Sequence, residues 1–189
     1  TEPGNVKLIL DGGSGSADTI KLGAAVDLTD GGANDVTSVF ANIDKIDLNG
    51  YTLKTNQKAL LANGNTWQLV NTAAGGSKAY TVALDAAQGS LVVDLTNVTT
   101  TNATFIVTGS AGNDTVIGAD SDDAITAGGG LDNLSGGAGG DTFIMQTNMG
   151  VDTVLQTIAG GAGSDKITLS GTVKDVAFTN VTSVETVDL

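Results

Sequence analysis

A nine-residue period between Gly109 and Ile144 constrains this sequence more than any other feature. Written in blocks of nine, the stretch reads GSAGNDTVI, GADSDDAIT, AGGGLDNLS and GGAGGDTFI. Every block has an aspartate at its sixth position and an apolar residue at its eighth, and most glycines precede the aspartate. Repetition of one short unit at a fixed period is typical of stacked architectures.

The composition of one block indicates its local structure. In Gly136–Ile144, four of the first six residues are glycine. Glycine permits left-handed backbone angles, so this part is predicted to curl tightly with its carbonyl groups turned inward. The last three residues suit a short strand. Turns and strands in alternation build a parallel β-roll, whose inward apolar column consists of Val116, Ile125, Leu134 and Phe143.

Stacked turns also bring the aspartates into a column beside the backbone carbonyls. Ca²⁺ takes roughly 6–8 oxygen ligands, so we expect several Ca²⁺ ions as the cofactor. Without a cation the carboxylates would repel one another, and binding and folding should therefore be coupled. The candidate metal ligands are the four column aspartates with neighbouring acids and loop glycines, namely Asp114, Asp123, Asp132, Asp141, Asp120, Asp122, Gly109, Gly112, Gly118, Gly130, Gly136 and Gly139.

The blocks resemble the GGxGxDxUx repeat of the RTX (repeats-in-toxin) proteins, in which U is a large apolar residue. GGAGGDTFI and the later GGAGSDKIT agree at every defined position. The other blocks differ from the pattern at four positions where the pattern has glycine, and the residues there are Ser110, Ala119, Ser121 and Ala127. The resemblance implies that ions lie between turns and that successive turns alternate sides. Asp114 would then pair with Asp132, and Asp123 with Asp141.

The stretch that follows the roll, residues 150–171, resembles the segment that closes RTX rolls. Its Asp152 and Asp165 are out of phase with the four blocks, so they either cap the roll or hold a separate ion, and we count both as candidate metal ligands. The ending NVTSVETVDL resembles repeats in RTX-type bacterial surface-layer proteins and large adhesins.

Outside the roll, short β-branched runs bounded by Gly, Asn and Asp predict further strands. The stretch Thr55–Gly64 predicts a short helix, with Thr55 or Asn56 as its N-cap. The clearest expected strands are Asn5–Leu10, Asp44–Leu48, Thr66–Val70, Ala79–Leu84, Ser90–Leu95 and Ala103–Thr108.

A longer repeat links the two ends of the chain. Gly12–Leu22 parallels Gly160–Leu169, and Val36–Leu48 parallels Val181–Leu189, so one module of turn, strand, VTSV segment and strand is expected twice. The aspartates of the first copy form either a second Ca²⁺ cluster or ordinary turns, and these residues are Asp11, Asp18, Asp27, Asp30 and Asp35.

We therefore expect an all-β chain made of four segments. These are a β module with a degenerate Gly/Asp repeat at 1–50, a β-rich segment at 51–108, the β-roll at 109–144 and a roll-closing β segment at 145–189. The single tryptophan, Trp67, and Tyr51 are expected to pack in the core, which has few aromatic residues.

The net charge excludes several classes of partner. The chain carries 21 acidic residues against 8 lysines, for a formal charge of −13. Such a charge argues against nucleic acid and anionic membranes as partners. No apolar stretch approaches the roughly 18 residues that a membrane-spanning helix needs, so we expect no membrane span.

The residues needed for common catalytic chemistry are missing, and we expect no enzyme activity. The chain has no His and no Cys, so the usual general base and thiol nucleophile are absent. An EF-hand counted from Asp120 fails, because Ile125 and Leu131 stand where glycine and glutamate are required. No GK[ST] follows the glycine clusters, which argues against a phosphate loop.

The expected function is structural. The resemblance implies a Ca²⁺-dependent module of a type I-secreted bacterial protein that folds outside the cell, on the bacterial surface or in the medium. A surface-layer protein that assembles into a lattice is favoured. The alternatives are an adhesin module, for which a cell-surface glycan or lipopolysaccharide is a possible partner, and the folding and secretion module of a protease or lipase.

Overall fold

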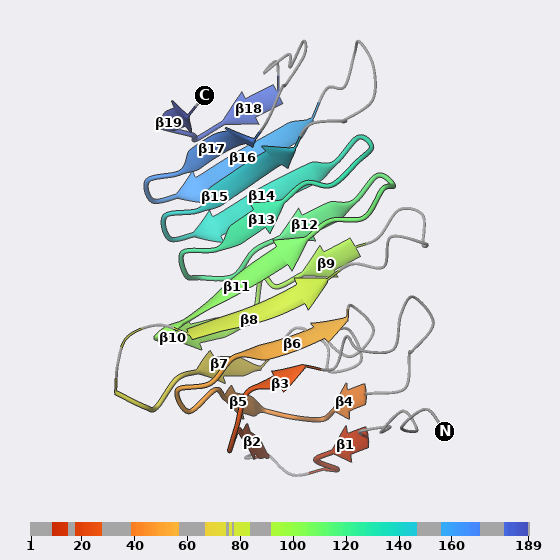
Figure 1. Cartoon of the computed structure of the whole chain (residues 1–189), viewed down its shortest axis with the longest axis vertical. Coiled ribbons are helices and arrows are strands. Elements are labelled where there is room, and N and C mark those ends of the chain that lie inside the picture. Colours follow the sequence, from red (N-terminus) through yellow and green to blue (C-terminus); the bar gives the residue numbers. More distant parts are fainter. Residues whose placement is uncertain are drawn as a thin grey trace.

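The computed structural model describes residues 9–14, 18–27, 39–56, 67–74, 76, 78–83, 92–146, 156–170 and 180–188, and the statements below refer to these. Its strands stack from the N-terminal end to the C-terminal end of one continuous solenoid (Figure 1). Every strand pair in this part of the chain is parallel. The expected all-β, parallel β-roll architecture is confirmed.

An eight-stranded sheet runs the length of the molecule and draws strands from all four predicted segments. In spatial order it contains β3 (Val26–Asp27), β6 (Leu53–Asn56), β8 (Lys78–Ala83), β11 (Ala103–Thr108), β13 (Ala124–Thr126), β15 (Thr142–Gln146), β17 (Lys166–Ser170) and β19 (Thr186–Asp188).

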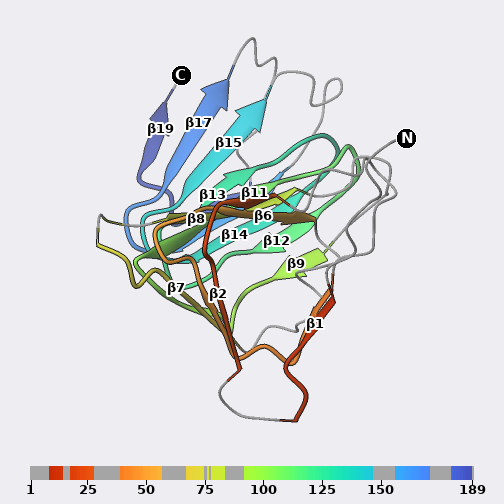
Figure 2. The same cartoon turned by 60° about the horizontal axis from the view of Figure 1, so that its bottom comes forward.

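A second sheet lies across the core from the C-terminal part of the first, as the view onto the N-terminal end shows (Figure 2). It contains β9 (Val92–Asp94), β12 (Thr115–Ile117), β14 (Asn133–Ala138), β16 (Thr157–Ala162) and β18 (Asn180–Thr182). The N-terminal coils are completed by two smaller sheets, one of β2 (Thr19–Lys21), β5 (Lys45–Asp47), β7 (Gln68–Val70) and β10 (Thr99–Thr101), the other of β1 (Ile9–Asp11) and β4 (Val39–Ala41).

The nine-residue period corresponds to half a coil. Val107 pairs with Ile125 and Ile125 with Phe143, each 18 residues further on in the same sheet. Val116 pairs with Leu134 in the facing sheet. The predicted apolar column therefore divides between two sheets, and its four members are at most 1% exposed. Alternate blocks lie on opposite sides of one core.

Aromatic residues fill the core where the N-terminal coils meet the roll. The ring centroid of Trp67 lies 6.1 Å from that of Tyr80 and 6.0 Å from that of Phe105, and the last two are 5.4 Å apart. The Tyr80 hydroxyl forms a 2.9 Å hydrogen bond with Thr55 Oγ1. Trp67 is buried as expected, whereas Tyr51 is exposed and the expectation for it was wrong.

The expected helix at Thr55–Gly64 lies mostly outside the described residues. Thr55 and Asn56 both belong to strand β6, so the residue after Thr55 is not helical and Thr55 is not an N-cap. The β-branched Thr55 suits the strand and places its hydroxyl on Tyr80, a contact that the local sequence does not reveal. Among the described residues no helix is long and apolar enough to cross a membrane.

The longer repeat has a structural counterpart at both ends of the solenoid. Ile20 pairs with Ile46 in the first copy, and Ile167 pairs with Val187 in the second. The register corrects one detail: Asp11 pairs with Ala41 and Ala159 with Thr182. The counterpart of 181–184 is therefore 40–43, the residues after the first VTSV rather than that motif itself.

Truncating Phe105 to alanine tests the core. The side chain is fully buried and contacts two other rings, so Phe105→Ala should lower the free energy of unfolding by about 3–5 kcal/mol. Urea unfolding followed by circular dichroism measures this. Val187→Ala is the control: at this 45% exposed position the substitution should change the free energy of unfolding by less than about 0.5 kcal/mol. Similar losses of unfolding free energy in both variants would contradict the described core.

Candidate metal centre

The glycine turns connect the two large sheets and fall into two rows along the solenoid. Turns from the eight-stranded to the five-stranded sheet contain Asp114 and Asp132, and Gln156 ends the next such connection; we call these three residues the first row. Turns in the opposite direction contain Asp123, Asp141 and Asp165, and Glu185 occupies the next coil; these four form the second row. The two rows lie on opposite sides of the roll.

Each row is linked by hydrogen bonds that run from coil to coil. The Asp114 N–H donates to Asp132 Oδ1 over 2.8 Å, and the Asp132 N–H donates to Gln156 Oε1 over 2.8 Å. In the second row, the N–H groups of Asp123, Asp141 and Asp165 donate to the side chain of the next member over 2.7–2.8 Å. The structure thus brings together the pairs that the resemblance implied.

The second oxygen of each carboxylate separates the aspartates into two groups. Asp114 Oδ2 accepts from the Ser110 N–H at 2.7 Å, and Asp123 Oδ2 accepts from the Ala119 N–H at 2.8 Å. The Oδ2 atoms of Asp132, Asp141 and Asp165 are buried and have no hydrogen-bond partner. All three side chains are at least 98% buried. A buried carboxylate oxygen without a protein donor is costly, so these three positions call for a cation or a proton.

Glycine is required where these turns pack on the carboxylates. A methyl group at Gly136 would overlap Asp141 Oδ2 and lie 2.6 Å from the Gly160 carbonyl oxygen. One at Gly160 would overlap Asp165 Oδ2. A methyl group at any of the predicted glycines 109, 118, 130 and 139 would likewise lie within 2.8 Å of a neighbouring coil's backbone. Backbone oxygens and carboxylates therefore lie close together, the donor set that Ca²⁺ prefers.

Burial makes full ionisation of the rows unfavourable. Burial is the main cause that raises the pKa of Asp141 to about 7, and the charges of Asp123 and Asp165 add to it. The pKa of Asp132 rises to about 6, through burial and the charge of Asp114. Burial also raises the pKa of Asp123 to about 6, with a contribution from Asp120. A bound cation would remove this cost at neutral pH.

Two predicted ligands lie on the outer side of the turns. Asp120 is exposed and accepts from both the N–H and the hydroxyl of Thr100, at 2.7 and 2.8 Å. Asp122 is exposed and accepts from the Gly140 N–H at 2.7 Å. These carboxylates bond to the preceding and following coils instead of joining the rows. Asp152 lies outside the described residues.

Gln156 and Glu185 were missed by the sequence analysis. Gln156 is buried, replaces a carboxylate in the first row, and donates from Nε2 to the Gly130 carbonyl at 2.8 Å. It lies 24 residues after Asp132 rather than 18, so the period does not reach it. Glu185 could have been predicted from the sequence, because alignment of the segments DKIDL and ETVDL places it opposite Asp44.

The N-terminal copy reproduces the end of the second row. The Asp18 N–H donates to Asp44 Oδ2 at 2.8 Å, as the Asp165 N–H does to Glu185. Asp18 Oδ2 also has no partner, although its side chain is only partly buried. Asp11 instead accepts from Gly13 and Asn42, and Asp30 and Asp35 lie outside the described residues. Either role considered for these aspartates stays a prediction.

Acidic side chains alone do not build a metal cage in the described part of the chain, where no group of three or more His, Cys, Asp or Glu converges. The oxygens that lie together are one or two carboxylates with backbone carbonyls. Comparison with family models, curated proteins and solved structures finds no match to this chain.

Replacing Gly136 with alanine tests the packing of the second row. Its methyl group would overlap the Asp141 carboxylate, so Gly136→Ala should destabilise the fold by about 1–3 kcal/mol, as overpacking generally does. Gly23→Ala is the matched control, because that position has open space and no positive φ. Thermal unfolding should separate the two variants, and equal melting temperatures would contradict the described turn.

The stability of the metal-free chain should depend on pH. Asp123, Asp132 and Asp141 have folded-state pKa values of about 6 to 7, above the ordinary aspartate pKa of 3.8. Their contribution to stability is therefore fully present below about pH 4 and is lost as the pH rises through 6 to 7.

Urea unfolding of chain stripped of metal on a chelating resin, at pH 4.5, 6 and 7.5, measures this dependence. Stability should fall across the series, and Asp141→Asn should flatten the step between pH 6 and 7.5. A stability that rises from pH 4.5 to 7.5 in the stripped chain would contradict the prediction.

Proposed function

We propose that this chain is a Ca²⁺-dependent structural module of a bacterial extracellular protein, exported by type I secretion. The observation that carries the proposal is the set of three buried carboxylate oxygens without a partner, on Asp132, Asp141 and Asp165. Each lies at the end of a glycine turn, and the stacked turns place backbone carbonyls beside the carboxylates. Hard oxygen donors of this kind suit Ca²⁺.

The chain's own residues would hold the ions between successive turns of a row. Asp141 and Asp165 supply carboxylates in the second row, and Asp132 supplies one in the first. Backbone carbonyls of the adjoining glycine turns complete the set. When bound, Ca²⁺ supplies positive charge that offsets the repulsion of the rows, so the folded form is favoured where Ca²⁺ is abundant.

Coupled binding and folding fits a protein that must cross membranes unfolded. A chain with a charge of −13 repels itself, and the buried rows increase that cost. At low Ca²⁺ the roll would remain open, and outside the cell it would close. The acidic charge keeps the chain soluble and away from nucleic acid.

Among extracellular roles, a surface-layer subunit is the one we propose. Its support is the VTSVETVDL ending and the repetitive solenoid, which suits assembly into a cell coat. Lattice formation in Ca²⁺ would distinguish it from an adhesin module, which would bind a glycan or lipopolysaccharide without ordered assembly. The folding and secretion module of an enzyme would stay monomeric in both tests.

Titration of the metal-free chain with Ca²⁺ tests the proposal. Far-UV circular dichroism should show a cooperative gain of β signal with Ca²⁺ and none with the same concentration of Mg²⁺. Asp141→Asn should raise the Ca²⁺ midpoint by at least roughly tenfold, since loss of a residue that only supports a metal ligand already costs 10–100-fold. Light scattering on the same samples reports assembly.

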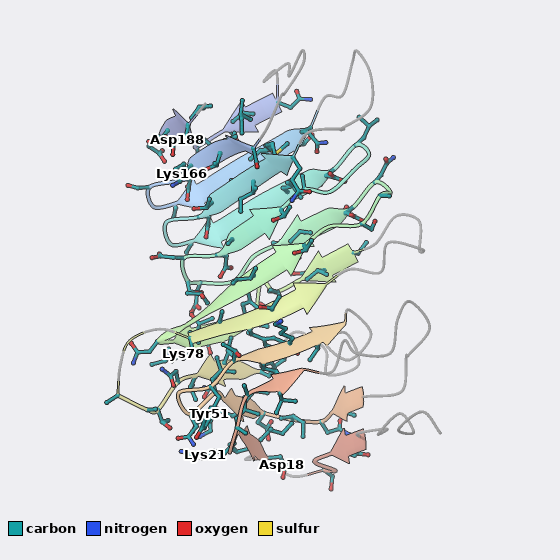
Figure 3. The ribbon with its side chains drawn as sticks, viewed as in Figure 1. Asp18, Lys21, Tyr51, Lys78, Lys166 and Asp188 are labelled. Atoms are coloured by element: carbon teal, nitrogen blue, oxygen red, sulfur yellow. The ribbon has the colours of Figure 1, made fainter. Side chains whose placement is uncertain are left out.

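The matched control is Asp188→Asn. Asp188 is about half exposed and faces Lys166 at 3.5 Å at the C-terminal end of the solenoid (Figure 3). An exposed ion pair of this kind contributes little, so this variant should keep the wild-type midpoint. If Ca²⁺ changes neither the dichroism nor the melting temperature of the wild-type chain, the proposed function is wrong.

A further inference from the structure

The five described turns of the two rows share a length of six residues and a terminal aspartate but have two backbone conformations. Three have glycine at the second position, Gly128, Gly137 and Gly161, with φ of +86°, +104° and +110°. The other two have Ser110 and Ala119 there, and neither has a positive φ. The three glycine turns are those whose aspartate has a free oxygen, and the other two are those whose aspartate is satisfied.

The backbone angle explains this correlation. Rotation about φ turns the N–H of the second residue, and in the Ser110 and Ala119 turns that N–H points at the turn's own carboxylate, over 2.7 and 2.8 Å. A positive φ directs the N–H elsewhere and leaves Oδ2 without a donor. Residues other than glycine lose about 1–2 kcal/mol in the left-handed region, so serine and alanine keep their turns in the hydrogen-bonded form.

Packing between coils supports the same division. A methyl group at Gly128 would overlap the Ser110 carbonyl oxygen, and one at Gly137 would overlap that of Ala119. The hydrogen-bonded turns thus lie directly against the glycine turns of the next coil. Ser110 adds a hydroxyl that contacts both oxygens of Asp114 at 2.9 and 3.0 Å, which makes that carboxylate fully satisfied without a cation.

We propose that the residue at the second position of each turn decides whether the turn takes a cation. Glycine opens the turns 127–132, 136–141 and 160–165 to Ca²⁺, and Ser110 and Ala119 close the turns 109–114 and 118–123. This inference rests on the proposed Ca²⁺ function and deepens it. Asp114 and Asp123 then act as hydrogen-bond acceptors, and the ions enter only the coils that follow.

The division has a consequence for how the roll forms. The coil that contains both closed turns needs no ion and can provide a preformed edge, with strands β12 and β13 (residues 115–117 and 124–126). The coils that follow pair with that edge in parallel and close when Ca²⁺ is present. Ca²⁺ would thus extend the roll from this coil towards its C-terminal end.

Opening a closed turn tests the inference directly. Ala119→Gly and Ser110→Gly should each bind one more Ca²⁺ per chain than the wild type at saturation, measured by equilibrium dialysis with metal analysis. Ala111→Gly is the matched control, because it makes a glycine at the third position of the 109–114 turn and should leave the count unchanged. Far-UV dichroism in Ca²⁺ checks that all variants stay folded.

A second set of variants removes carboxylates instead. Asp132→Asn and Asp141→Asn should each lower the number of bound ions by one, whereas Asp114→Asn and Asp123→Asn should keep it. If the wild type binds Ca²⁺ but opening Ala119 or Ser110 adds no ion, and all four asparagine variants lose ions alike, the inference is overturned and the proposed function survives. If the wild type binds no Ca²⁺, both are wrong.

Discussion

The roll depends on a hydrogen bond that joins one coil to the next through a carboxylate. In both rows the backbone N–H of an aspartate is satisfied by the acidic or amide side chain one coil further on. The parallel strand ladder sets the coil spacing, and the short aspartate side chain just reaches across it to the neighbouring coil. The hydrogen bond explains why the aspartate must recur in phase with the apolar residue two positions later, which anchors the strand in the core.

The same bond creates the electrostatic problem that a cation would solve. Stacking carboxylates one strand apart, in positions almost closed to water, raises the pKa of Asp141 to about 7, mainly through burial. Backbone donors satisfy the second carboxylate oxygens of Asp114 and Asp123. Among the described residues no donor does so for the second oxygens of Asp132, Asp141 and Asp165. The glycine turns thus leave carboxylate oxygens without a donor, and an ion bound there would satisfy them.

Local patterns in the sequence predicted the roll well, because an aspartate and an apolar residue recur every nine positions along the chain. The two columns and the burial of Phe143 follow from the nine-residue spacing, whereas the alternation of sides was implied by the resemblance to RTX repeats. The N-terminal coils were less predictable. Their steps vary, from 23 residues between Ile46 and Leu69 to 31 between Gln68 and Thr99, so no fixed period marks them. Gln156 was missed for the same reason, since it lies outside the 18-residue step. The roles of Ser110 and Ala119 depend on a backbone angle that residue types alone do not reveal.

The rows of hydrogen bonds also give the molecule a direction. Each coil uses its side chain to complete the coil before it, so a coil that begins at one of these aspartates keeps an N–H without its acceptor until the next coil arrives. The last described coil differs, because the Glu185 N–H donates to the Asp165 carbonyl. The structure ends this series in the second row with Glu185, whose side chain is one methylene longer than that of the aspartates it follows. A chain that emerges gradually from its N-terminus would therefore close one coil behind its leading edge, in steps of 18 to 24 residues. Length added in smaller amounts would leave the last coil open.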